Sequence, residues 1–201
     1  MAKLYFRYGA MNAAKTLNLL SVRYNYLNQG LIALVIKPVV DTRFGQEMVK
    51  SRAGMECKAD LLLNRDTDIL KVIYDGPRPF PAVLLLEEAQ FCTCQQIEQL
   101  RLITEAYDVP VICYGLRTNY KTCMFEGSKR LFELADSIEE VKTICTNSCT
   151  RKAIFNARFV NGSFTKMRED APEIAIESQD VKYYSLCFKC YNDLAKFNID
   201  K

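Results

Sequence analysis

A run of small residues followed by lysine and threonine is the feature of this sequence with the clearest chemical potential. It follows the β-rich residues 4–7 directly and comprises Gly9, Ala10, Met11, Asn12, Ala13, Ala14, Lys15 and Thr16. Between a strand and a helix, such a loop presents backbone N–H groups to phosphates, while the lysine neutralises β- and γ-oxygens and the threonine ligates Mg²⁺. The pattern GxxxxGK[ST] is incomplete because position 14 is alanine. The alternative is a lysine and a threonine that only open a helix.

Two adjacent carboxylates form the second candidate feature. Glu87 and Glu88 stand at the end of the apolar run 82–86, and Ala89-Gln90-Phe91 follows them. In open α/β sheets ligands bind at the carboxyl ends of the strands, where unsolvated carboxylates are costly unless coordinated. One carboxylate there can reach the magnesium shell while the other accepts a proton from an attacking hydroxyl. Two solvated carboxylates that begin a loop are the alternative.

Four of the nine cysteines form two close pairs near the C-terminal end. They are Cys145 and Cys149, with three residues between them, and Cys187 and Cys190, with two. Thiolates at such spacings can meet on a tetrahedral Zn²⁺ ion, whose binding can fold a lobe too small for its own core. Four unligated thiols are the alternative. The remaining cysteines lack a second pair at a fitting distance and are interpreted as buried or incidental thiols: Cys57, Cys92, Cys94, Cys113 and Cys123.

The elements that must position these residues alternate between strand-like and helix-like patterns. Continuous apolar runs occur at residues 4–7, 31–36, 82–86 and 109–113, and amphipathic segments separate them. In the first of these segments the spacing predicts an apolar helical face of Leu17, Leu20, Tyr24 and Leu27. Such alternation is typical of a parallel sheet covered on both faces. We therefore expect residues 1–142 to form a doubly wound α/β domain of the P-loop type.

The character of the sequence changes after residue 142. The cysteine pairs, a predicted hairpin that turns at Asn161-Gly162 and a polar stretch before Pro172 indicate a small β-rich zinc-binding lobe over residues 143–201.

Composition excludes several classes of protein. The 27 basic residues exceed the 24 acidic ones by a net charge of only +3, and they form no block, so a nucleic-acid partner is not expected. An alternative interpretation, a zinc-ribbon adaptor that binds nucleic acid, is supported by the cysteine pairs alone. The apolar runs are far too short to span a bilayer and no secretory signal is visible, which predicts a cytoplasmic protein without a membrane partner.

The order of the motifs resembles the type II thymidine kinase family. Over residues 4–191 the motifs are the P-loop, Asp-x-Arg, Ser-Arg-x-Gly, Glu-Glu-Ala-Gln-Phe, Tyr-Gly-Leu-Arg-Thr, Phe-Glu-Gly-Ser and the two cysteine pairs. The resemblance implies transfer of the γ-phosphate of ATP to the 5′-hydroxyl of thymidine, with Mg²⁺ and a structural Zn²⁺ as cofactors. It also implies possible use of deoxyuridine, a homotetramer and feedback inhibition by dTTP.

The resemblance further implies roles for individual residues. Glu88 falls on the catalytic base, Thr16 and Glu87 on magnesium-associated positions, and Asp41 and Arg43 on the segment beside the phosphates. Six positions match residues that surround the nucleoside, over which the loop before Tyr183 closes: Met11, Phe91, Leu116, Tyr120, Phe125 and Tyr183.

Three departures from the family pattern bear on activity. Ala14 replaces a glycine, so its methyl group crowds the phosphate path or demands an unfavourable backbone conformation. Glu87 replaces an aspartate, and Ser178-Gln179 replaces a Gly-Gly of the closing loop. The alternative function is therefore a catalytically weakened, nucleotide-binding member of the same family.

Overall fold

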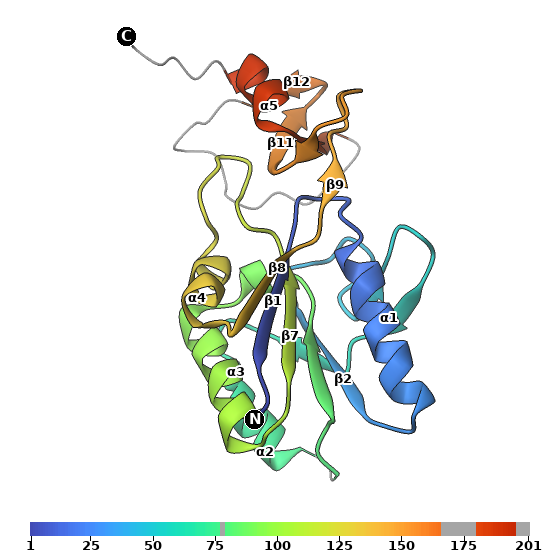
Figure 1. The fold of residues 1–201 in the computed structure, drawn as a ribbon, viewed down its shortest axis with the longest axis vertical. Coiled ribbons are helices and arrows are strands. Elements are labelled where there is room, and N and C mark those ends of the chain that lie inside the picture. Colours follow the sequence, from blue (N-terminus) through green and yellow to red (C-terminus); the bar gives the residue numbers. More distant parts are fainter. Residues whose placement is uncertain (77–78, 166–179, 196–201) are drawn as a thin grey trace.

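Six parallel strands form the central sheet in the order β5-β2-β6-β7-β1-β8 (Figure 1). The structure is a computed structural model that describes residues 1–76, 79–165 and 180–195. The central strands have continuous apolar sequences because both of their faces are buried. The six strands are β1 (Leu4–Tyr8), β2 (Ala33–Pro38), β5 (Leu61–Leu63), β6 (Val83–Leu86), β7 (Val111–Gly115) and β8 (Ser137–Glu140).

Helices cover both faces of this sheet, which confirms the predicted doubly wound α/β fold. Helix α1 (Lys15–Asn28) packs on one face, and α2 (Ile69–Asp75), α3 (Cys94–Ala106) and α4 (Glu126–Leu134) pack on the other (Figure 1). A short antiparallel hairpin of β3 (Met48–Lys50) and β4 (Glu56–Lys58) adjoins α1.

The predicted apolar face of α1 was wrong in part. Leu20 is buried, but the side chains of Tyr24 and Leu27 are 63% and 46% exposed. The helix instead buries Leu19 beside Leu20 and packs Val22 and Tyr26 partly against the sheet. Residues 19, 22 and 26 also recur at spacings of three and four, so the sequence carries two overlapping stripes, and packing on the sheet selects one of them.

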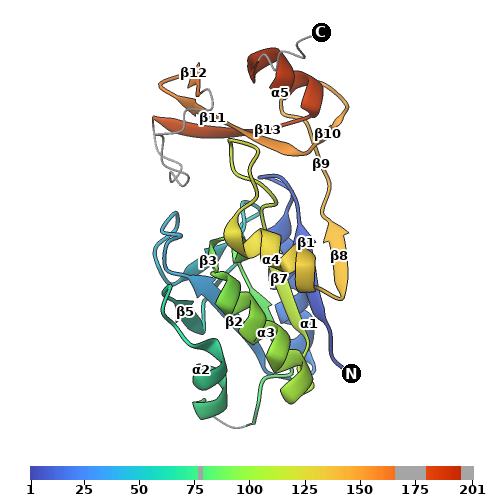
Figure 2. The same ribbon diagram turned by 90° about the vertical axis from the view of Figure 1, so that its left-hand side faces the viewer.

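A separate, β-rich lobe follows β8. It contains the β9 (Thr143–Ile144) and β10 (Lys152–Ala153) pair, a sheet of β12 (Ser163–Phe164), β11 (Phe155–Val160) and β13 (Val181–Leu186), and α5 (Phe188–Ala195) (Figure 2). The predicted turn at Asn161-Gly162 is present, with φ of 49° and 75° at the two positions. These left-handed angles are those of a type I′ turn and suit a tight antiparallel connection.

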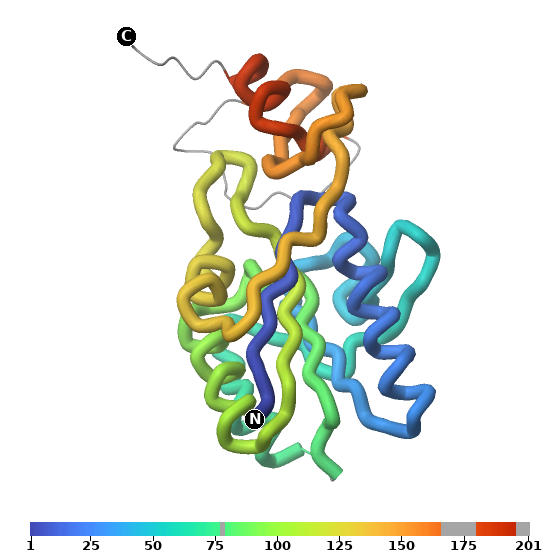
Figure 3. The backbone as a smooth tube through the Cα atoms, viewed as in Figure 1, coloured from blue at the N-terminus to red at the C-terminus, as the bar shows by residue number. Residues whose placement is uncertain are grey.

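The lobe lies over the end of the sheet from which the loop after β1 emerges (Figure 3). Two hydrogen bonds join that loop to the lobe: the Met11 N–H donates to Asn156 Oδ1 at 2.8 Å, and Ser185 Oγ donates to the Met11 carbonyl at 2.5 Å. No helix in the described part of the chain combines the length and apolar character needed to cross a membrane.

Candidate active site

The loop between β1 and α1 adopts a left-handed conformation at two positions, one an asparagine, which tolerates it, and the other an alanine, which does not. Asn12 has a φ of 64°, and Ala14, directly before the helix, has φ 57° and ψ 25°. A left-handed conformation costs an L-residue about 1–2 kcal/mol, and glycine escapes this cost. The structure therefore confirms that alanine at position 14 occupies an unfavourable backbone conformation.

Lys15 lies across this loop. Its Nζ donates to the carbonyl oxygens of Gly9 at 3.1 Å and Ala10 at 2.9 Å. Burial, together with the charges of Arg43 and Arg52, lowers the pKa of Lys15 to about 8, and Glu87 partly opposes this shift. An anionic ligand would offset these effects because it brings negative charge to a desolvated ammonium group.

Glu87 connects the end of β6 to the start of α1. The Thr16 hydroxyl donates to Glu87 Oε1 at 2.5 Å, whereas Glu87 Oε2 is buried without a hydrogen-bond partner among the described residues. Burial raises the pKa of the Glu87 carboxyl, although the Thr16 hydrogen bond and the charge of Lys15 oppose that shift. A hydroxyl and a carboxylate with a free oxygen are donors that suit a hard divalent cation such as Mg²⁺. The longer side chain of glutamate thus reaches the loop directly.

A charged cluster faces these residues from the loop after β2. Arg43 pairs with Asp41 at 2.7 Å and also with Glu88, while buried Lys37 pairs with Asp41 at 3.3 Å. Burial alone would raise the pKa of Asp41, but the Arg43 hydrogen bond and the charges of Arg43 and Lys37 hold it below its usual value. Asp41 therefore remains ionised and keeps Arg43 beside Glu88.

One cleft of about 380 Å³ is lined by Lys15, Thr16, Asp41, Arg43, Glu87 and Glu88. Glu87 and Glu88 meet the phosphate-type loop there, as predicted for the carboxyl ends of the strands, and Arg43, a position implied by the family resemblance, lines the same cleft. The lining residues are Met11, Asn12, Ala13, Ala14, Lys15, Thr16, Leu17, Asp41, Arg43, Phe44, Met48, Val49, Lys50, Ser51, Arg52, Ala53, Glu87, Glu88 and Leu116. Gly9 and Ala10 lie at the base of the loop, where their carbonyl groups accept hydrogen bonds from Lys15.

The predicted nucleoside-binding residues divide into two groups. Met11 and Leu116 line the cleft, whereas the other four do not belong to its lining within the described ranges. Phe91 packs edge-to-face on Phe125 with ring centroids 5.7 Å apart, and the guanidinium of Arg158 lies 3.8 Å from the centre of the Tyr120 ring. Tyr183 lies on β13 opposite Arg158. Ser178 and Gln179 of the predicted closing loop lie outside the described residues.

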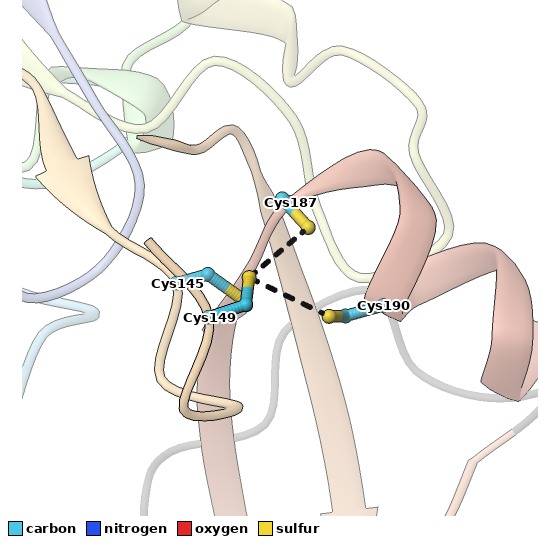
Figure 4. A group of neighbouring side chains, drawn as sticks. All are labelled: Cys145, Cys149, Cys187 and Cys190. Carbon is cyan, nitrogen blue, oxygen red and sulfur yellow. Dashed lines mark hydrogen bonds between the residues drawn. The ribbon is translucent and has the colours of Figure 1, made fainter. Parts of the chain in front are cut away.

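The four paired cysteines converge in the lobe, as Figure 4 shows. Cys145 and Cys149 lie on the segment between β9 and β10, Cys187 lies directly before α5, and Cys190 lies in the first turn of α5. All four Sγ atoms lie within 4.8 Å of one another, with Cys149 Sγ 3.7 Å from Cys187 Sγ and 3.8 Å from Cys190 Sγ. Four sulfurs bound tetrahedrally to zinc at about 2.3 Å lie about 3.8 Å apart, so this cluster fits Zn²⁺.

Comparison with known proteins assigns the chain to a family. The family model described as thymidine kinase matches residues 2–191. The thymidine kinase of Francisella tularensis subsp. holarctica is 42% identical over 96% of this chain and 98% of that protein. Those of Streptococcus gordonii and Enterobacteria phage T4 are 40% and 39% identical, over 95% and 98% of this chain and 96% and 98% of their own lengths. The chain belongs to the thymidine kinase family.

Several residues of this family member's cleft were missed by sequence reasoning. The segment from Met48 to Ala53 lines the cleft, and Arg52 acts electrostatically on Lys15. Ser-Arg-x-Gly at residues 51–54 is one of the motifs that carry the family resemblance, although no role is predicted for it from the sequence. The glycine at position 54 was the available signal, because glycine is typical of a turn, and in the structure its φ is 93°. Nothing in the sequence around Lys37 indicates that this lysine is buried, because its burial depends on contacts that form only in the folded chain.

Proposed function

We propose that this chain is an active thymidine kinase that transfers the γ-phosphate of ATP to the 5′-hydroxyl of thymidine. The observation that carries the proposal is the meeting of Lys15, Thr16, Glu87 and Glu88 in a single cleft, from two separate segments of the chain. Phosphoryl transfer needs little more from a protein than positioning and electrostatic stabilisation, and this set provides both.

Each residue has a defined part in this proposal. Glu88 accepts the proton of the attacking hydroxyl, Lys15 holds the phosphates, and Arg43 stabilises the charge that develops during transfer. Thr16 and Glu87 would hold Mg²⁺, which neutralises charge on the phosphate oxygens when it is bound with ATP. Met11 and Leu116 contribute apolar surface beside the nucleoside. No covalent enzyme intermediate is required.

The zinc site has a structural part in this proposal. With four protein thiolates, a bound Zn²⁺ ion keeps no open position for chemistry. It would hold the start of α5 against the turn that carries Cys149. We also infer from family membership that dTTP inhibits the enzyme, that the chain forms a homotetramer, that deoxyuridine is accepted and that the protein is cytoplasmic.

The test is a product assay on purified, zinc-loaded protein with Mg·ATP and a panel of nucleosides. The expected product is thymidine 5′-monophosphate, with little monophosphate from cytidine or purine nucleosides. If thymidine and ATP both bind but no monophosphate forms, the second candidate holds: a nucleotide-binding family member without activity. The strained backbone of Ala14 is the observation that favours this second candidate.

A further inference from the structure

Gln90 is a buried polar residue at the cleft that the proposed mechanism leaves without a role. It belongs to the short 3-10 helix η1 (Ala89–Phe91), which follows Glu88, and only 2% of the residue is exposed. A buried carboxamide is costly unless its hydrogen-bonding groups are satisfied, so its partners indicate what it does.

Both ends of the Gln90 carboxamide have defined partners. Its Oε1 accepts from the Leu116 backbone N–H at 3.0 Å, and its Nε2 donates to Glu88 Oε2 at 2.5 Å. The first bond settles the orientation of the amide, because a backbone N–H can only donate. The N–H₂ end must therefore face the carboxylate of Glu88.

The Leu116 backbone, to which this carboxamide is hydrogen-bonded, is itself held in place by α4, and the neighbouring Gly115 leaves room for the carboxamide. Leu116 directly follows β7, and its carbonyl oxygen accepts from Ser128 Oγ of α4 at 2.5 Å. Gly115 leaves the space that the carboxamide fills, since a Cβ atom at that position would lie 2.8 Å from Gln90 Oε1. Gln90 thus links the end of β6 to the end of β7.

The backbone of Glu88 needs such support. Glu88 adopts φ 49° and ψ 42°, a left-handed conformation that costs a residue with a Cβ atom about 1–2 kcal/mol. Strained positions of this kind persist only when the surrounding structure fixes them. Arg43 holds one carboxylate oxygen of Glu88 and Gln90 holds the other.

We propose that Gln90 is a positioning residue for phosphoryl transfer, which fixes the Glu88 carboxylate against the Leu116 backbone at the edge of the cleft. This inference rests on the proposed function, because it assigns Gln90 a role through the catalytic base. Gln90 itself need not touch either substrate. Misplacement of a catalytic group by about 1 Å can cost on the order of 10²-fold in rate.

Two substitutions at Gln90 test the proposal. Gln90→Met removes both hydrogen bonds at similar volume, and Gln90→Glu keeps an acceptor for Leu116 but places a second carboxyl group against Glu88, so that the two compete for one proton. We expect both variants to lose about 10-fold or more in kcat for thymidine, with KM for ATP and thymidine within about twofold of wild type. A wild-type kcat in both variants would overturn the proposal.

Gln99 offers a matched control. Its carboxamide makes the same pattern of bonds away from the cleft, since Oε1 accepts from the Ile69 N–H at 2.9 Å and Nε2 donates to Asp68 Oδ1 at 3.0 Å. Gln99→Met should lower Tm but leave kcat unchanged. An equal loss of kcat in Gln99→Met would show that any buried glutamine has this effect, and would contradict a positioning role.

A double-mutant cycle with Glu88→Gln isolates the route of the effect. If Gln90 acts through Glu88, Gln90→Met should cause no further loss of single-turnover rate in the Glu88→Gln background. Losses that multiply would refute the proposal, because Gln90 would then act independently of the base. The wild-type protein in the same experiment tests the proposed function separately from the role of Gln90. If the wild type forms no thymidine monophosphate, the proposed function is wrong. If it does form the product, the double-mutant cycle tests the role of Gln90 alone.

Discussion

Lys15 is a cation whose surroundings oppose its charge. Its pKa of about 8 results from burial and from two nearby arginines, and it predicts a pH-dependent affinity for ATP. The phosphates of ATP bind the protonated amine more tightly than the neutral one. Above this pKa Lys15 must therefore take up a proton when ATP binds, and the affinity for ATP falls as the pH rises. Between about pH 7 and about pH 9 we expect the affinity for ATP to weaken about 10-fold.

Calorimetry or a fluorescent ATP analogue can measure this dependence on the wild-type protein. Lys15→Arg is the control, because a guanidinium stays protonated throughout this range. The affinity of that variant should change little with pH. A flat profile for the wild type would show that Lys15 does not lose its proton within the tested range.

The alanine at position 14 stores strain that glycine would release. Ala14→Gly should raise the free energy of unfolding by about 0.5–1 kcal/mol, since relief of the left-handed conformation exceeds the extra entropy of an unfolded glycine. Ala13, whose φ is not positive, is the matched control, and Ala13→Gly should lower stability. Urea unfolding measures both, and a destabilised Ala14→Gly would contradict the strain argument.

At the scale of elements, a buried lysine holds the loop after β2 to the sheet. Lys37 Nζ donates to the carbonyl oxygens of Gly45 at 3.0 Å and Met48 at 2.7 Å, and it pairs with Asp41. Lys37→Met leaves these buried groups without their cation. We expect a loss of about 3 kcal/mol in the free energy of unfolding, and a lower kcat/KM, because the loop that carries Arg43 loosens.

Lys58 provides the comparison for this prediction. It pairs with Glu47 at 3.4 Å, but its side chain is 76% exposed. Lys58→Met should therefore cost less than about 1 kcal/mol and leave kcat/KM unchanged. Equal effects of the two substitutions, measured by denaturant unfolding and steady-state kinetics, would show that the burial of Lys37 is unimportant.

The elements also show what could be read from the sequence. The strands β1, β2, β6 and β7, the helix that begins at Lys15 and the turn at Asn161-Gly162 follow from local patterns, because hydrophobic period and turn chemistry act over a few residues. The short edge strands β5 and β8 were not predicted from the sequence. The buried face of α1 was predicted wrongly because two apolar stripes satisfied the same period. The partners of Gln90 and Lys37 lie on other elements, so no pattern around either residue in the sequence could reveal them.

At the scale of the whole molecule, the cysteine lobe and the phosphate-type loop depend on each other through Met11. If zinc holds the lobe together, its loss should also disturb the loop, because Asn156 and Ser185 then release the Met11 backbone. Cys187→Ser should lose the zinc ion bound by the wild type, lower Tm and weaken ATP binding.

Cys123→Ser is the control for this prediction, since Cys123 is exposed and lies outside the four-sulfur cluster. It should retain wild-type zinc content and Tm. Elemental analysis measures the zinc content of both variants, and thermal unfolding measures their Tm. A Cys187→Ser protein that keeps its zinc would contradict the assignment of the four cysteines as a zinc site. The cysteine pairs made this cluster predictable, whereas the link through Met11 arises only from how the lobe lies on the sheet.

The proposed function depends on Glu88, which acts as the base when phosphate passes from ATP to thymidine. Its most direct test is a single-turnover measurement with γ-labelled ATP on wild type and Glu88→Gln, with binding of both substrates measured separately. We predict that the variant binds both substrates normally but forms labelled thymidine monophosphate on the order of 10²-fold more slowly. Transfer by Glu88→Gln at the wild-type rate would contradict the mechanism proposed for this cleft.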